Sequence, residues 1–196
     1  MAALLGAASA LGATWWAHAA MPAFDARSMP LAMAGTPGVP GAGVFNLLAF
    51  IVPGACAAAC AIQWWRAVAL RAFAARIGAG LAVLAALAFI AQGAWPLQGD
   101  LVAGSGARIH AAAWMAWWLG AASAGVATAL GLVRCQRAMA VGSAVAAIAI
   151  VLCALNLVGL PPGWAHRASV LAWGAWTWLL ALRLAAPARP APRAQP

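Results

Sequence analysis

The chain has 196 residues, of which 67% are hydrophobic and only 7% are charged. Soluble domains carry about a quarter charged residues, so this composition excludes a soluble globular protein and predicts an integral membrane protein. The net charge of +9 comes from eleven arginines, with no lysine, set against two aspartates. These arginines lie singly or in short clusters between apolar runs, a pattern that encodes membrane topology and does not build a nucleic-acid-binding surface.

Six apolar runs are each long enough for a helix that crosses a hydrocarbon core about 30 Å thick. We expect the helices at about 2–21, 44–65, 74–95, 109–133, 138–160 and 165–185. The fold class predicted is therefore an all-α integral membrane bundle of six transmembrane helices in one domain, residues 1–186. Residues 187–196 form a Pro-rich, low-complexity tail that we expect to be disordered.

The first run ends in Ala17, His18 and Ala19, which resemble a signal-peptidase site. It has no positively charged segment before it, so we expect a retained membrane anchor and not a cleaved signal. Residues 22–43, between the first two runs, are rich in Pro and Gly and are predicted to lie over the helix ends as a lid. Pro53 and Gly54 should bend the second helix.

Arginine placement predicts the orientation. Eight arginines fall in the segments 66–76, 134–137 and the tail, whereas the loops 22–43, 96–108 and 161–167 hold one each. By the positive-inside rule the eight face the cytoplasm, which places both termini inside. The expected location is a bacterial inner membrane, crossed several times.

All three histidines and both aspartates then fall on the outer face. One interpretation is a metal site, with His110, His166 and Asp100 as ligands suited to zinc, although no HxxxH or HExxH spacing supports it. Haem held by His110 and His166 is a second interpretation. A pair of thiolates, Cys56 and Cys60, one helical turn apart, could also hold a metal, but buried cysteines usually act as small apolar residues.

A third interpretation is a serine hydrolase. Ala-Gly-Ser-Gly at 103–106 and Ala-His at 165–166 resemble fragments of the rhomboid intramembrane proteases, whose Ser and His would correspond to Ser105 and His166. The serine motif lacks its leading Gly, and no His and Asn pair on the second helix would serve the oxyanion. The structural alternative is that the polar groups pair with one another, Asp100 with Arg108 or Asp25 with Arg167, and cap helix ends near water.

The segment 28–54, SMPLAMAGTPGVPGAGVFNLLAFIVPG, resembles a signature of domain-of-unknown-function family 998, a group of prokaryotic six-span membrane proteins. Residues 93–110, with Trp-Pro followed by an Asp and a His, and residues 163–182 are similar to its other motifs. The resemblance implies the six-span architecture and no known activity. The site positions it implies are Ser28, Phe45, Asn46, Pro96, Asp100, His110 and Arg167. This chain departs from the family pattern at Trp95, where Phe is usual, and at His166, where Gln is usual.

We therefore predict an outward-facing polar pocket covered by the 22–43 loop, which binds a lipid headgroup or a small amphiphile. Arginines would attract anionic groups, Asp100 would orient His110, and tryptophans would hold the apolar portion. A membrane-embedded hydrolase, using either the metal set or the Ser105 and His166 pair, is the alternative. Membrane lipids are the expected partners, and nucleic acid is not. The candidate ligand-binding residues are Asp25, Ser28, Asn46, Asp100, Arg108, His110, His166 and Arg167.

Overall fold

The computed structural model describes residues 1–21, 24–68, 73–98 and 105–185, and all regular secondary structure within these ranges is helical. The elements are α1 (Ala2–Ala20), a 3-10 turn η1 (Leu31–Gly35), α2 (Ala42–Asn46), a π-helical turn η2 (Leu47–Ile51), α3 (Val52–Val68), α4 (Phe73–Ala94), α5 (Ser105–Leu132), α6 (Arg137–Ala154) and α7 (Pro162–Ala185). The predicted all-helical class is confirmed. The predicted tail, 187–196, lies outside the described residues.

Five helical stretches are long and apolar enough to cross a membrane: Ala42–Val68, Phe73–Ala94, Gly106–Leu132, Arg137–Ala154 and Pro162–Ala185. The apolar part of α1, Ala2–Ala17, is shorter. By length and composition the chain is thus a multi-pass membrane protein. Many large apolar side chains on these helices point outward, such as Leu84, Val145 and Leu171, each about 60% exposed, as lipid-facing residues do.

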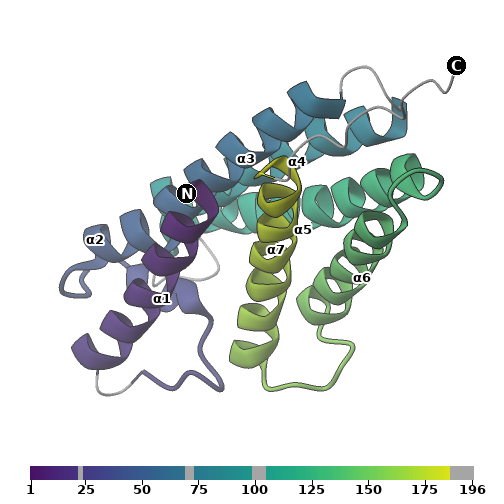
Figure 1. The fold of residues 1–196 in the computed structure, drawn as a ribbon. Coiled ribbons are helices and arrows are strands. Elements are labelled where there is room, and N and C mark those ends of the chain that lie inside the picture. Colours follow the sequence, from purple (N-terminus) through teal and green to yellow (C-terminus); the bar gives the residue numbers. More distant parts are fainter. Residues whose placement is uncertain (22–23, 69–72, 99–104, 186–196) are drawn as a thin grey trace, which may run out of the picture.

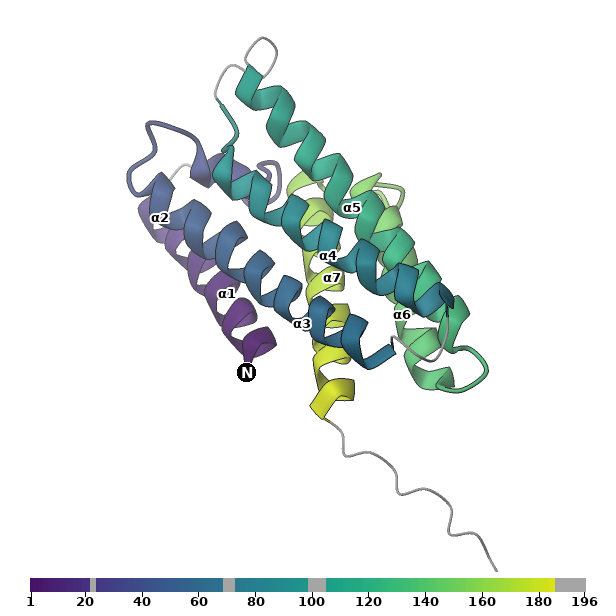
Figure 2. The same cartoon turned by 90° about the horizontal axis from the view of Figure 1, so that it is seen from above.

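The helices form two layers (Figures 1 and 2). One layer contains α3, α4 and α5 side by side, and the other contains α1, α7 and α6 packed across it. The most extensive contact in the molecule joins α4 to α5, whereas α1 contacts α3 extensively and α7 only slightly. This uneven packing leaves space between α1 and α7.

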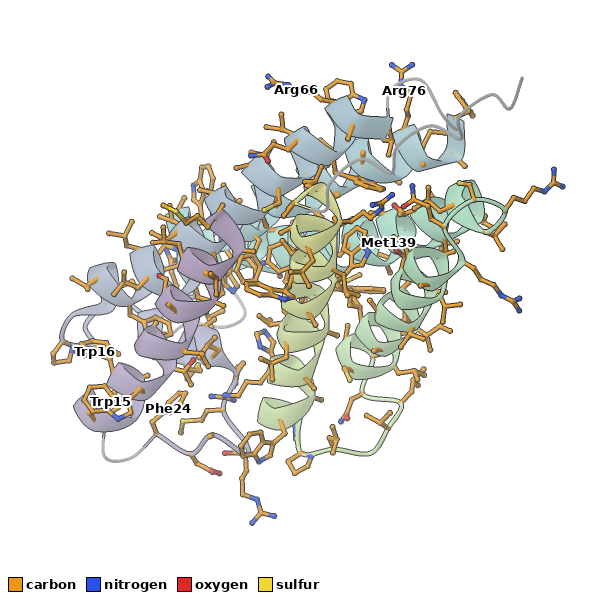
Figure 3. All side chains as sticks on the ribbon, viewed as in Figure 1. Trp15, Trp16, Phe24, Arg66, Arg76 and Met139 are labelled. Carbon is orange, nitrogen blue, oxygen red and sulfur yellow. The ribbon has the colours of Figure 1, made fainter. Side chains whose placement is uncertain are left out.

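The molecule has two unlike ends. Arg66 and Arg76 lie together at one of them, and Trp15, Trp16 and Phe24 lie at the other (Figure 3). We call the first the arginine end, because the helix ends and the turn there carry five exposed arginines, and the second the loop end, because residues 24–41 cross it. At the arginine end, Arg183 Nε donates to Gln136 Oε1 at 2.8 Å and ties α7 to the turn before α6. The exposed arginines are Arg66, Arg76, Arg134, Arg137 and Arg183.

Two local features differ from, or refine, the sequence expectation. The helix predicted to run to residue 160 ends at Ala154, because Asn156 (φ 51°) and Gly159 (φ 67°) adopt left-handed conformations and Pro161 and Pro162 follow. The irregularity expected at Pro53 takes the form of the π-helical turn η2 just before it. A wider turn relieves the clash of the proline ring with the preceding carbonyl and tolerates its missing N–H.

Candidate functional site

The described part of the 24–41 segment packs onto the helix ends. Its own Phe24 and Leu31 side chains are buried, and Ala34 of the η1 turn has no exposed surface. Within its first turn, Ser28 Oγ donates to Asp25 Oδ2 at 2.6 Å, and the Arg27 N–H donates to Asp25 Oδ1 at 3.0 Å. These donors stabilise the ionised carboxylate, so the pKa of Asp25 is lowered from its usual 3.8, with the Ser28 hydroxyl as the largest cause.

This turn is clamped onto the first turn of α7. The Gly163 N–H donates to Arg27 O at 2.8 Å. Arg167 Nη1 reaches Ala26 O and Met29 O, each at 2.9 Å, as well as Gly163 O at 2.8 Å. A Cβ on Gly163 would lie 2.7 Å from Met29 O and 2.9 Å from Arg27 O, and it would strike Ala26 O. Only glycine at 163 therefore lets the turn approach so closely.

Arg167 is buried, with 8% of its surface exposed, and its guanidinium carbon lies 5.3 Å from the centre of the Phe24 ring. Sequence analysis considered an ion pair between Arg167 and Asp25, but the hydrogen bonds that Arg167 donates within the described residues all go to backbone carbonyls. Its Nε and Nη2 have no hydrogen-bond partner within the described part of the chain. A buried, charged donor without a partner typically lowers the stability of a protein by about 1–3 kcal/mol or more. Leaving these two groups unsatisfied therefore destabilises the folded chain.

His110, on the first turns of α5, caps the end of α4. Its Nδ1 lies 3.0 Å from Trp95 O and 3.2 Å from Gln92 O, so it must carry the proton and donate to these carbonyls. Gln92 O would ordinarily accept from the N–H four residues on, but that residue is Pro96, which has none. The imidazole thus replaces the donor that the proline removes.

Two buried amides lie near this cap. Asn46 Nδ2 donates to Gly35 O at 2.8 Å, which joins α2 to the η1 turn. Gln92, which has no exposed surface, leaves both its Oε1 and Nε2 without partners. The interior of the loop end therefore contains polar groups that the described protein does not satisfy.

His166 stacks on Trp114, with ring centres 4.0 Å apart and planes 13° from parallel. Its Nδ1 is buried without a hydrogen-bond partner. The ring also lines a cavity of about 240 Å³ at the loop end, together with Pro30, Trp114, Cys153, Asn156 and Pro162. Stacking fixes the plane of the imidazole, so His166 faces this small cavity in one orientation.

A larger cavity of about 490 Å³ lies between α1 and α7, and its lining is almost entirely apolar. Ala3, Gly6, Ala7 and Ala10 form one wall from α1, and Pro53 and Cys56 of α3 lie behind. The α7 wall begins at the loop end with Trp164 and Arg167 and continues through Val170, Trp173, Gly174 and Trp178. We call this cavity the α1–α7 groove. Its volume is in the range that small-molecule ligands occupy.

The structure distributes the sequence-predicted residues over several places. Asp25 and Ser28 share one turn, and Arg167 clamps that turn to α7, whereas Asn46 and His110 lie around the end of α4. Arg108, which the sequence assigned to the pocket, is exposed and lines neither cavity. Neither cavity is lined by both His110 and Arg167. Asp100 lies outside the described residues.

The hydrolase alternative stays a prediction. Ser105 begins α5, but its side chain belongs to the part of the chain that is not described, as does Asp100. Within the described residues, no three His, Cys, Asp or Glu side chains are grouped so that they could hold a metal ion.

No family model matches the chain, and no curated protein or solved structure is found to be similar to it. The resemblance to domain-of-unknown-function family 998 therefore stays a prediction as well.

The α1–α7 groove was not predicted from the sequence. One feature of the sequence points to it: Ala3, Gly6, Ala7 and Ala10 place small residues on one face of α1 at helical spacing. Such a face usually indicates close packing against another helix. This face does pack closely against α3, where a Cβ on Gly6 would lie 3.2 Å from Cys56 Cβ. Toward α7, which contacts α1 only slightly, the small side chains leave a gap.

Proposed function

We propose that this protein is a six-span inner-membrane protein that binds an amphiphilic lipid in the α1–α7 groove. The observation that carries the proposal is the lining of the groove, which is apolar along two helices and has the buried guanidinium of Arg167 at its loop end. An apolar wall accommodates a hydrocarbon tail, and a fixed cation near one end accommodates a polar headgroup. Membrane lipids have this division of chemistry.

In this proposal the loop end faces the periplasm, and both termini face the cytoplasm. The five exposed arginines at the opposite end support this orientation, because cytoplasmic connections carry an excess of Arg. The clamped 24–41 segment would lie at the outer interface, where the buried Phe24 and the exposed Trp15 and Trp164 suit the boundary between lipid and water.

The lipid-binding proposal is tested by filling the groove. Gly174 lines it, and a Cβ there would meet no atom within 4 Å, so Gly174→Trp should place an indole in the groove without disturbing the helices. Gly12 on α1 has equally open surroundings but does not line the groove, which makes Gly12→Trp the matched control. Lipid that survives extensive detergent washing would be quantified by mass spectrometry.

We expect wild type and Gly12→Trp to retain lipid at about one molecule per chain, and Gly174→Trp to lose most of it. Equal retention in all three proteins would overturn the proposal, because the retained lipid would then sit elsewhere on the surface.

Orientation has its own test in the native cysteines. Cys135 is exposed at the arginine end, whereas Cys153 lies near the loop end. A membrane-impermeant maleimide applied to intact spheroplasts of a Cys153→Ser variant should leave Cys135 unlabelled until the membrane is permeabilised. Labelling of Cys135 without permeabilisation would reverse the proposed topology.

A further inference from the structure

The side chain of Arg167 uses only part of its hydrogen-bonding capacity. Its Nη1 group carries two hydrogens and faces three carbonyl oxygens, those of Ala26, Met29 and Gly163, so it is fully engaged. These contacts hold the guanidinium in one position, and the Phe24 ring packs against it. The orientation of the remaining donors is therefore fixed by the protein.

Those remaining donors are Nε and Nη2, and both are buried without a partner in the described part of the chain. Together they form one edge of the guanidinium, with two roughly parallel N–H bonds. Such an edge matches two oxygens of a phosphate or carboxylate, and this is the arrangement in which arginine binds oxoanions most specifically. The nearest described acid, Asp25, is engaged by Ser28 and by the Arg27 N–H.

The location of this edge defines the shape of what it can bind. Arg167 lines the α1–α7 groove, and the α7 wall continues from it to Trp178, about 16 Å further along the helix. Between these two residues the α7 wall is formed by Val170, Leu171, Trp173, Gly174, Ala175 and Thr177. A ligand held by Arg167 would lay an apolar chain along this wall, toward the arginine end.

We propose that the Nε and Nη2 edge of Arg167 binds the phosphate group of an anionic lipid whose tail lies in the α1–α7 groove. This inference rests on the proposed function and adds to it the chemical class of the headgroup and the atoms that recognise it. Both donors are buried, so the proposal requires a side chain that lines the groove, such as the half-exposed Trp164, to rotate before the phosphate reaches them.

The test compares headgroups with identical tails. Purified protein is equilibrated with mixed micelles of dioleoyl phosphatidylglycerol and dioleoylglycerol, which has the same tails but no phosphate, and the lipid retained after washing is identified by native mass spectrometry. We expect wild type to favour phosphatidylglycerol about tenfold, and Arg167→Gln to bind both lipids equally. Arg167→Lys keeps the charge but has no fork, so its preference should fall several-fold. Retained dioleoylglycerol serves as the fold check for each variant.

Arg108→Gln is the matched control, because it removes an exposed arginine from the same helix-end region without changing the groove. Its preference should equal that of wild type. A wild-type preference that persists in Arg167→Gln, or that disappears in Arg108→Gln, would overturn the inference while leaving tail binding in the groove intact. Loss of all retained lipid from wild type would instead contradict the proposed function.

Inorganic phosphate distinguishes the two sources of this headgroup chemistry. Displacement of phosphatidylglycerol by millimolar phosphate would show that the edge takes the phosphate group alone, and resistance to displacement would show that the tail is required. Binding of phosphate that is equally strong in wild type and Arg167→Gln would count against the proposed edge.

Discussion

The two halves of the molecule are packed on different principles. Toward the arginine end, α4 and α5 meet through small residues: a Cβ on Gly78 would lie 2.5 Å from Thr128 Oγ1 and 2.9 Å from Ala124 O. On α5, a Cβ on Gly131 would lie 2.5 Å from the backbone nitrogen of Ala75. The helix backbones therefore lie almost in contact, and dispersion forces between them hold this half together.

Toward the loop end, close backbone contacts remain at Gly93 and Gly163, but large rings fill most of the space between the helices. Phe89 lies at the centre of an aromatic cluster, 5.3 Å from Phe50, 5.4 Å from Trp117 and 4.7 Å from Trp173 between ring centres. Among the described residues, this half holds most of the buried polar groups without partners, those of Thr36 Oγ1, Gln92, Trp117 Nε1, His166 Nδ1 and Arg167. Two more, Trp64 Nε1 and Thr128 Oγ1, lie toward the arginine end. Both cavities open in the loop half or extend from it.

The contrast shows where the chain can accommodate a ligand. Backbones in direct contact leave no room to adjust, so the arginine half acts as a rigid frame. The loop half contains space and buried donors that a bound molecule would satisfy, which is the arrangement expected of a site and costly in a merely structural region. Variants that act in one half only should reveal this division.

The largest effect is expected in the rigid half. Gly78→Ala would place a methyl group 2.5 Å from Thr128 Oγ1 and 2.8 Å from Thr128 N, so α4 and α5 must separate, at a cost of about 3 kcal/mol. Gly80, two residues further along α4, has no atom within 4 Å of the corresponding position. Gly80→Ala should therefore be neutral or slightly stabilising. Unfolding by denaturant in detergent micelles measures both, and equal stabilities would refute the proposed backbone contact.

A smaller and more local effect is expected at the clamp. Gly163→Ala would drive a methyl group against the carbonyls of Ala26, Arg27 and Met29 and should cost about 2 kcal/mol. Because the clamped turn would loosen before the helices do, the exposed Arg27 should become a faster cleavage site for trypsin. Gly12→Ala, on an open surface of α1, is the control and should leave the cleavage rate unchanged. Faster cleavage in neither variant would mean that the clamp does not protect the turn.

Hydropathy alone predicted the helical class, because a run of about 20 apolar residues has few ways to satisfy its backbone in lipid. It could not place the helix ends. The early end of α6 depends on Asn156 and Gly159 accepting left-handed conformations, and α5 begins at Ser105, before the apolar run predicted to start at 109. Local hydrogen bonds determine where such helices end, and an average of hydropathy over a window of residues carries no information about them.

The site was less predictable than the fold. That Arg167 lies at the same end as the 24–41 segment could be predicted from its position, but its partners are carbonyls of a turn whose shape depends on Gly163 and Ser28. The groove depends on the angle between α1 and α7, which no short motif encodes. The role of His110 could have been deduced, because Pro96 always leaves the carbonyl four residues earlier in need of another donor.

An effect of intermediate size on stability is expected in the loop half, where His110 caps the end of α4. His110→Phe should cost about 1–2 kcal/mol, because it leaves Gln92 O and Trp95 O without their donor. In a Pro96→Ala background, residue 96 gains an N–H that can bond to Gln92 O, so the same substitution should cost about 1 kcal/mol less. Unfolding free energies of the four proteins form a double-mutant cycle. A coupling of zero would show that the imidazole does not substitute for the missing N–H.

The smallest expected effect concerns the surface of the clamp. Since hydrogen bonds from Ser28 and from the Arg27 N–H lower the pKa of Asp25 below 3.8, its contribution to stability is complete above pH 3.8 and is lost as the pH falls through the lower value of the folded state. Ser28→Ala removes the largest cause and should move the pKa upward toward 3.8. The chain has two aspartates and no glutamate, so a sample labelled with ¹³C at the aspartate carboxyl carbons gives two side-chain signals, and Asp25→Asn assigns them. An unchanged titration in Ser28→Ala would show that the hydroxyl does not stabilise the carboxylate. The turn would then be held by its contacts with α7 alone.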